Sequence, residues 1–195
     1  MMVLQSNEGA EQRRTDEDLA RLAAGGQGEV FAQIYERYYA RTYRLAYGMT
    51  GARSAAEDLT QEIFIRAYQR LHQFAGAARF STWFYRLAVN CALNFRARRE
   101  RREQEREDDG QIDLLPANEC VEGTMLQQQL QREVQRALLS LKPELRVVVI
   151  LKDIEGLSYE EIAARTGCAS GTIASRLNRA RALLARKLAH LKGTR

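Results

Sequence analysis

Cations without neighbouring acids gather at the C-terminal end of this 195-residue chain. From Ile162 to the last residue there is no Asp or Glu, and the cations are Arg165, Arg176, Arg179, Arg181, Arg186, Lys187, Lys192 and Arg195. Because the net charge of the whole chain is only +5, the rest of the sequence carries a net negative charge. A basic block at one end of a chain indicates a polyanionic partner.

The basic stretch has the pattern of a helix-turn-helix. A capping box, Ser158 with Glu161, predicts a short helix over 159–166, and a turn at Gly167 leads into a last helix over 170–191. One face of that last helix is apolar and is expected to pack on a core; it consists of Ile173, Leu177, Ala180, Leu184 and Leu188.

The opposite face of the last helix has side chains that can read DNA. In this motif the N-terminal part of the second helix enters the major groove, where an Arg can bond guanine in bidentate fashion. We expect contacts to bases and nearby phosphates from Thr172, Ser175, Arg176, Asn178 and Arg179. We expect contacts to phosphates from Arg165, Arg181, Arg186 and Lys187. The alternative is a basic helix that is only solvated, although exposed helices ordinarily mix both signs of charge.

A second set of candidates combines aromatic rings with arginines. Trp83 and Arg86 lie on the helix expected to begin at the cap Ser81, and Arg79 precedes it. Rings beside cations suit unpaired bases, because stacking tolerates any base while Arg holds the backbone. The loop before the helix could also help to hold a flipped base. On composition alone, packing of the rings in a core is the better interpretation.

A polar face lies on the helix that is expected to begin with the capping box of Ser54 and Glu57. The apolar stripe of this helix consists of Leu59, Ile63, Phe64, Ala67 and Leu71. Residues that lie away from the stripe or flank it are Asp58, Gln61, Glu62 and Ile65. A face that docks on a protein and a face that is only solvated explain this pattern equally well.

The other periodic segments are expected to be helical as well, and no alternation typical of strands competes with them. A capping box at Thr15 begins the first helix, and a second helix covers 27–49. Its apolar face is expected to contain Val30, Phe31, Ile34, Tyr35, Tyr38, Leu45, Ala46 and Met49. The predicted fold class is all-α.

An acidic stretch interrupts the helical pattern between two ordered parts. Residues 103–123 contain eight acids and one cation, Arg106, and Gly and Pro break any helical period. Such a stretch cannot bury much apolar surface and is expected to be a flexible linker. The predicted organisation is a disordered tail over 1–14, a helical domain over 15–102, the linker, and a second helical domain over 124–195 that contains the helix-turn-helix.

Several classes of protein are disfavoured. The three Cys lie far apart without a C-x-x-C pair, which argues against a disulfide scaffold or a zinc site. We expect no cofactor and no enzymatic activity, because the sequence has no Gly-rich phosphate loop, metal cluster or nucleophile–base pair. No apolar run approaches the roughly 18 residues of a membrane span, and the N-terminus lacks the apolar core of a signal peptide.

Two parts of the sequence resemble conserved regions of the bacterial RNA polymerase sigma factors. The runs AEDLTQEIFIRAYQRL (56–71) and FSTWFYRLAVNCALN (80–94) are similar to region 2. The run LKPELRVVVILKDIEGLSYEEIAARTGCASGTIASRLNRARALLARKL (141–188) is similar to region 4. The two regions in this order, with only a short linker between them, resemble the extracytoplasmic-function (ECF) group of the sigma-70 family. The resemblance covers 15–191.

The resemblance implies an alternative sigma factor that binds core RNA polymerase and directs promoter-specific initiation. It implies that the recognition helix reads the duplex −35 element. It also implies that the −10 element is melted and read, with a base of the non-template strand flipped out, by the loop 73–80 and by Arg79, Trp83, Arg86, Asn90 and Asn94. Ala174 and Asn178 depart from the family's usual residues, and the loop 75–78 is less polar than is common.

The resemblance also implies partners. Asp58, Gln61 and Glu62 match the face that docks on the coiled coil of the polymerase β′ subunit. The apolar surface of region 4 would meet the β flap tip, and the linker would pass near the active site and the RNA exit path. An anti-sigma factor, a cytoplasmic location and a role in stress response are further expectations. The alternatives are a helix-turn-helix regulator that acts without being a polymerase subunit, and a nucleic-acid-processing enzyme with a basic docking domain.

Overall fold

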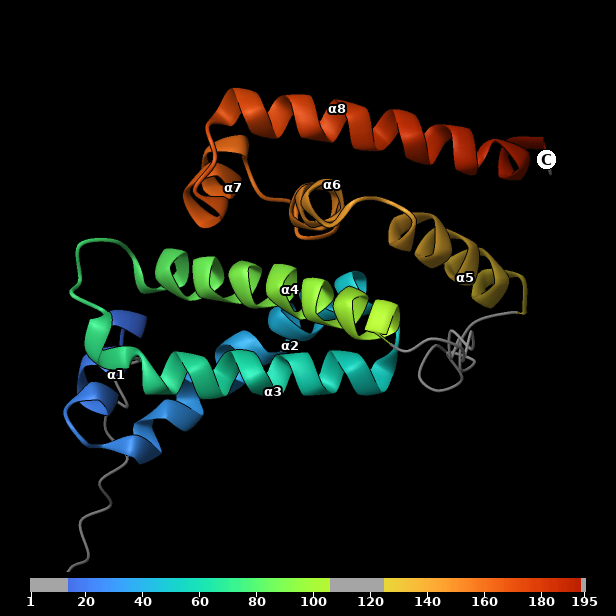
Figure 1. Ribbon diagram of the computed structural model, residues 1–195. Helices are drawn as coiled ribbons and strands as arrows, with labels where there is room; N and C mark the ends of the chain where they lie inside the picture. Colours follow the sequence, from blue (N-terminus) through green and yellow to red (C-terminus); the bar gives the residue numbers. More distant parts are fainter. Residues whose placement is uncertain (1–13, 106–124, 194–195) are drawn as a thin grey trace, which may run out of the picture.

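The computed structural model describes residues 14–105 and 125–193 of the chain. This part is built from helices without strands, as the sequence predicts (Figure 1). The α-helices are α1 (Asp16–Ala24), α2 (Phe31–Thr50), α3 (Arg53–Gln69), α4 (Phe80–Glu105), α5 (Met125–Leu139), α6 (Pro143–Val149), α7 (Tyr159–Thr166) and α8 (Ser170–Lys187).

The helix boundaries differ from the predicted ones in several places. The second helix starts with a 3-10 turn, Gly28–Val30, and extends to Thr50. α6 continues into a π-helical segment, Ile150–Ile154, and α8 ends earlier than expected and is followed by the 3-10 segment Ala189–Gly193. α4 runs through Glu105, so the first three residues of the predicted linker are helical. The remainder of the linker and the predicted tail, apart from residue 14, lie outside the described residues.

The N-terminal helices surround an apolar core that matches most of the predicted stripes. From α2, the buried members of the predicted face include Ile34, Tyr38 and Leu45, whereas Tyr35 is 42% exposed. The prediction that Tyr35 faces the core is therefore wrong. All five residues of the predicted stripe of α3 and the turn after it are buried, namely Leu59, Ile63, Phe64, Ala67 and Leu71.

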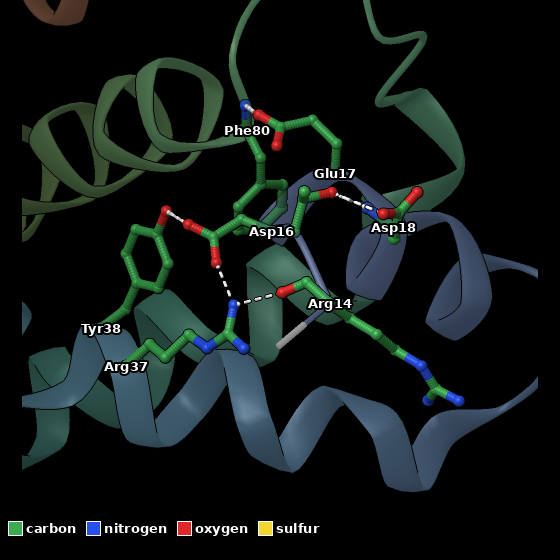
Figure 2. A network of polar contacts seen from close by, with 8 residues as sticks. Arg14, Asp16, Glu17, Asp18, Arg37, Tyr38 and Phe80 are labelled. Carbon is green, nitrogen blue, oxygen red and sulfur yellow. Dashed lines mark hydrogen bonds and ion pairs between the residues drawn. The ribbon is translucent and has the colours of Figure 1, made fainter. Parts of the chain in front are cut away.

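The first helix ties α2 to the start of α4 through polar contacts (Figure 2). The Asp16 carboxylate accepts hydrogen bonds from the Tyr38 hydroxyl at 2.6 Å and from Arg37 at 2.7 Å. Burial, together with the hydrogen bond to Asp16, raises the pKa of Tyr38, so its hydroxyl remains a donor. Glu17 accepts the backbone N–H of Phe80 at 2.9 Å. This carboxylate satisfies one of the free N–H groups at the start of α4.

Two of the predicted helix caps are wrong. α3 begins at Arg53, after the N-cap residue Ala52, so Ser54 lies inside the helix, and Glu57 pairs with Arg53 at 3.0 Å instead. α4 begins one residue before Ser81, and its first N–H is bonded by the carboxylate from α1. Glu57, which the predicted box would have used, is paired with Arg53, and α4 begins before its predicted cap residue.

The C-terminal helices form the predicted helix-turn-helix from α7 and α8. The turn passes through Gly167, which has a φ of 71°, a conformation that favours glycine. Ile162 of α7 is buried in the same apolar cluster as three residues of the predicted stripe on α8, which are Ile173, Leu177 and Ala180. Leu184, further along the stripe, packs on this core while partly exposed. The apolar stripe thus fixes which face of α8 is left open.

The capping box at the start of α7 is present as predicted. The Ser158 Oγ accepts the backbone N–H of Glu161 at 3.1 Å, and the Glu161 carboxylate accepts the N–H of Ser158 at 2.8 Å. We expect Ser158→Ala to lower the free energy of unfolding by about 1 kcal/mol, since loss of the side-chain oxygen leaves an N–H of the first turn without its partner. Urea denaturation followed by circular dichroism measures the change, and Ser158→Thr, which keeps the oxygen, is the control. Equal stability of both variants would contradict a role for the cap.

The two groups of helices pack directly against each other. α4 lies between α3 on one side and the C-terminal helices on the other (Figure 1), and α7 and α6 contact it. α2 contacts both α5 and α6. Buried residues of the two groups form one continuous cluster, in which Val148 and Ile150 join Leu45 and Met49. The all-α fold with two helical regions is confirmed, and their docking adds a feature that the sequence pattern did not predict.

Candidate nucleic-acid interface

The open face of α8 carries the residues predicted to read bases. Thr172, Ser175, Asn178 and Arg179 are exposed on it. Arg176 is half-buried, and its Nη1 lies 3.3 Å from the Cys168 Sγ. The buried stripe of α8 thus points these polar side chains away from the core, where a major groove would fit them.

Three of the four residues predicted to contact phosphates are also exposed on α8. Arg186 and Lys187 lie in its last turn, and Arg181 forms an ion pair with Asp153. Arg165 is different, because it belongs to α7 and its side chain is only 11% exposed. Its guanidinium lies over the ring of Tyr85 of α4, 4.4 Å from the ring centroid. Arg165 is therefore not part of the open basic face.

Four of the residues predicted to read single-stranded DNA share one face of α4, and the fifth, Arg79, directly precedes the helix. Their spacing of three and four residues places them on one side of the helix, and the exposed ones are Arg79, Arg86, Asn90 and Asn94. Trp83 is half-buried, with ring centroids 5.7 Å from Phe74 and 5.6 Å from Phe80. Packing of rings in the core therefore describes Phe80, which is fully buried, while Trp83 keeps part of its surface open.

The turn of the helix-turn-helix lies against one of these residues. A Cβ at position 167 would lie 3.1 Å from Nη2 of Arg86. Arg86 and Arg165 are therefore both positioned where α7 meets α4, one from each group of helices.

The polar face of α3 is present where it was predicted. Asp58, Gln61 and Ile65 are exposed, with Ile65 at 49%. Glu62 is half-buried and pairs with Arg66 at 2.6 Å. The face thus combines polar side chains with an exposed apolar one.

An aromatic groove beside this face was missed by the sequence reasoning. It has a volume of about 500 Å³ and lies between α2 and α3. Its lining includes Gln61 and Ile65 together with Phe31, Tyr35, Tyr39, Glu57, Thr60, Phe64, Tyr68 and Gln69. Tyr39, Tyr43 and Tyr47 extend the aromatic row along α2, with centroid distances of 6.0 Å and 6.2 Å. The spacing of four residues between these tyrosines was the available signal, but only Tyr35 was included in the prediction, as part of the apolar face.

Other kinds of site find little support in the described residues. No group of three or more His, Cys, Asp or Glu side chains within 14–105 and 125–193 is placed to hold a metal ion. None of the helices within these ranges has the length and hydropathy that a membrane span requires.

Comparisons with known proteins agree with the two helical regions. The sequence pattern of Sigma-70 region 2 matches residues 34–102, and that of Sigma-70, region 4 matches residues 131–184. The chain is 33% identical over 181 residues to the ECF RNA polymerase sigma-E factor of Haemophilus influenzae, covering 89% of this chain and 95% of that protein. It is 37% identical over 142 residues to the ECF RNA polymerase sigma-E factor of Escherichia coli K12, covering 67% and 72% of the two chains.

Two solved structures share the fold. CnrH in complex with the cytosolic domain of CnrY has a TM-score of 0.65 and 25% identity, over 90% of this chain and 97% of that one. The sigma factor RpoE in complex with the anti-sigma factor NepR from Bartonella quintana has a TM-score of 0.64 and 26% identity, over 85% and 98%.

Proposed function

The chain belongs to the sigma-70 family, within its ECF group, and from this premise we propose which residues carry out each step of initiation. As an alternative sigma factor it directs promoter-specific transcription. We assign region 2 to residues 15–102, the linker to 103–123 and region 4 to 124–195. The observation that carries the assignment is that two separate faces, on α8 and on α4, present polar and basic side chains on rigid helices.

The first face reads the −35 element. Thr172, Ser175, Arg176, Asn178 and Arg179 contact base edges and nearby phosphates in the major groove, and Arg181, Arg186 and Lys187 contact the flanking phosphates. The support is their exposure on the side of α8 opposite its buried stripe, together with the absence of acids from the whole of α8. Arg is the side chain best suited to guanine, while phosphate contacts add affinity without sequence choice.

The second face captures the −10 element. Arg79, Arg86, Asn90 and Asn94 hold the unpaired non-template strand along α4, and the open part of the Trp83 ring supports a flipped base. Since stacking on an aromatic ring is favourable for any base, trapping of unpaired bases drives melting, and neighbouring polar groups choose the sequence. The shared face of α4 supports this assignment.

Core RNA polymerase binds to both regions. Its β′ coiled coil contacts region 2 at the face of Asp58, Gln61 and Glu62, and its β flap contacts the apolar surface of region 4. The aromatic groove extends the first of these surfaces, because Gln61 and Ile65 line it. Large rings at the centre of an interface ordinarily provide most of the binding energy.

An anti-sigma factor controls the chain by covering these surfaces. The supporting observation is that the two similar structures are complexes, one of CnrH with CnrY and the other of RpoE with the anti-sigma factor NepR. The chain acts in the cytoplasm as a regulatory subunit without an activity of its own.

Reconstituted transcription tests the proposal. Purified core polymerase is incubated with the full chain and a genomic library of promoters, and transcript starts are mapped. We expect starts that depend on the chain and share a −35 and a −10 element. If no transcript start depends on the chain while the chain still binds duplex DNA, the result would contradict the proposed function. It would favour a helix-turn-helix regulator that acts without being a polymerase subunit.

Ile65→Glu tests the groove. A charge at its rim would lose its hydration against apolar rings when the polymerase binds, so we expect affinity for core polymerase to fall by about 5-fold or more. Fluorescence anisotropy of the labelled chain with core polymerase measures the loss. Ser54→Ala, at an exposed position near the start of the same helix, is the control and should bind as the wild type does. Unchanged affinity of Ile65→Glu would remove the groove from the interface.

A further inference from the structure

The start of α4 has no capping side chain of its own. The helix begins at Phe80, so the residue before it is Arg79, whose guanidinium donates hydrogen bonds and accepts none. The loop residues 75–78 are Ala, Gly, Ala and Ala, which have no polar side-chain atom. Because the first N–H groups of a helix have no acceptor within the helix, this end of α4 depends on an acceptor from another part of the chain.

Glu17 of α1 supplies that acceptor. Its Oε1 accepts the backbone N–H of Phe80 at 2.9 Å, across 63 residues of sequence (Figure 2). The positive end of the helix dipole also favours a carboxylate at this place. Glu17 therefore acts as a cap for α4, although it belongs to another helix.

The helix that carries Glu17 is itself held in place. Leu19, on the next turn of α1, is buried in the core. Asp16, the residue before Glu17, accepts hydrogen bonds from Arg37 and Tyr38 of α2 (Figure 2). A functional group whose neighbours are locked by packing and hydrogen bonds keeps its geometry. The Glu17 carboxylate therefore reaches the start of α4 from a fixed support.

Phe80 connects the Glu17 carboxylate to the ring that is proposed to support a flipped base. Its side chain is fully buried, and its ring centroid lies 5.6 Å from that of Trp83 and 5.4 Å from that of Phe74. Phe74 and Trp83 also lie together, with centroids 5.7 Å apart. The loop residues 75–79 between Phe74 and Phe80 are exposed. The bond to the N–H of Phe80 thus fixes one end of this loop, the first turn of α4 and the Trp83 ring together.

We propose that Glu17 is a positioning residue for capture of the −10 element. Its carboxylate holds the N–H of Phe80 and so keeps the first turn of α4, the Trp83 ring and the end of the loop in the arrangement that receives an unpaired base. Glu17 itself does not touch the DNA. Because the arrangement is formed before the base arrives, less conformational freedom is lost on capture. The role in capture rests on the proposed function, whereas the hold on α4 does not.

Variants at position 17 test the hold on α4 in the free chain. Glu17→Ala removes the acceptor, and Glu17→Asp keeps the charge but draws the oxygens back by one methylene group. In both variants we expect the Phe80 amide to exchange with deuterium about 10-fold faster, as measured by NMR. Trp83 is the only Trp of the chain, and we expect acrylamide to quench its fluorescence more strongly in both variants.

Two further variants are the controls. Glu17→Gln keeps an oxygen at the same reach and should restore the slow exchange and weak quenching of the wild type, which separates reach from charge. Glu36→Ala, which removes an exposed charge from α2, should leave both measurements unchanged. If Glu17→Ala and Glu17→Asp behave as Glu36→Ala does, the proposal is overturned. Glu17→Asp decides the question even where Glu17→Ala does not fold.

Promoter opening tests the role in capture. Each variant is assembled with core polymerase on a promoter recovered by reconstituted transcription, and the permanganate reactivity of unpaired thymines follows opening with time. We expect Glu17→Ala and Glu17→Asp to open the promoter about 5-fold more slowly than Glu17→Gln and the wild type do. The affinity of the full chain for a −35 duplex should stay unchanged, because α8 is not altered.

Three outcomes contradict part of this reasoning. Equal opening by Glu17→Asp and the wild type would refute the role in capture. Loss of −35 affinity along with opening would show that Glu17 only supports the fold, and would refute it as well. If the wild type opens no promoter, the proposed function fails, while exchange of the Phe80 amide and quenching of Trp83 still decide whether Glu17 positions α4.

Discussion

Arg146→Ala is expected to lower the free energy of unfolding by roughly 3 kcal/mol or more. The guanidinium donates to the carbonyls of Leu138, Leu139, Leu141 and Met49, all at helix ends or in the turn between α5 and α6. Removal of the side chain leaves a void and several buried acceptors without donors, and each such acceptor costs about 1–3 kcal/mol unless water reaches it. Urea denaturation followed by circular dichroism measures the loss.

Arg136→Ala is the matched control for this substitution. Its side chain is 59% exposed and lies 3.6 Å from Glu133, a surface pair that contributes between about 0 and 1 kcal/mol. Arg146→Lys adds a second comparison, because one ammonium cannot reach carbonyls spread around a planar guanidinium. If Arg146→Ala and Arg136→Ala lower the free energy of unfolding by the same amount, the buried contacts contribute no more to stability than a surface ion pair does.

The pair Arg176→Ala and Arg179→Ala is expected to have the largest effect on promoter binding. If each arginine bonds a base in the major groove, each substitution costs about 1–3 kcal/mol, or about 5- to 150-fold in affinity for the −35 duplex. Fluorescence anisotropy measures binding of the full chain to a duplex that carries the −35 sequence and to a scrambled duplex. The loss should be larger on the first duplex, because scrambled DNA offers no bases for these arginines to select.

Lys187→Ala separates base reading from phosphate binding. Lys187 is exposed in the last turn of α8, and a phosphate contact there should weaken binding to both duplexes alike and reduce the dependence of affinity on salt by about one ion. If Arg176→Ala and Arg179→Ala behave as Lys187→Ala does, both arginines contact phosphates. Unchanged −35 binding in both arginine variants would remove them from the interface.

Local pattern was reliable where the partners of a residue are close in sequence. The capping box of Ser158 and Glu161, the turn at Gly167 and the buried stripe of α8 follow from contacts within one or two helical turns, and the structure has each of them. The box at Ser54 failed because α3 begins before Ser54 and Glu57 pairs with Arg53 of the same helix. The cap at Ser81 failed because α4 begins at Phe80, whose N–H is bonded by Glu17 of α1, and a partner from another helix leaves no trace in the local pattern.

The aromatic residues of the candidate site show the same limit of local sequence patterns. Periodicity placed Tyr35 on the apolar face of α2, yet the ring lines an open groove with Ile65 of α3. Trp83 was expected either in the core or against bases. In the structure it is half-buried, because its ring packs on Phe74 and Phe80 while part of its surface stays exposed. Hydrophobic spacing shows which face of a helix avoids water, but not whether a neighbour covers all of that face.

Sequence patterns were enough to predict the helices, the two regions, the family and the open face of α8. These depend on side-chain spacing along single helices and on motifs, all of which are local. The docking of region 4 on region 2 became visible only in the folded chain, where Arg44 bonds Glu155, 111 residues away in sequence, and Arg146 bonds the end of α2, 97 residues away. Such contacts depend on the shapes and charges of two surfaces that are complete only once each region has folded.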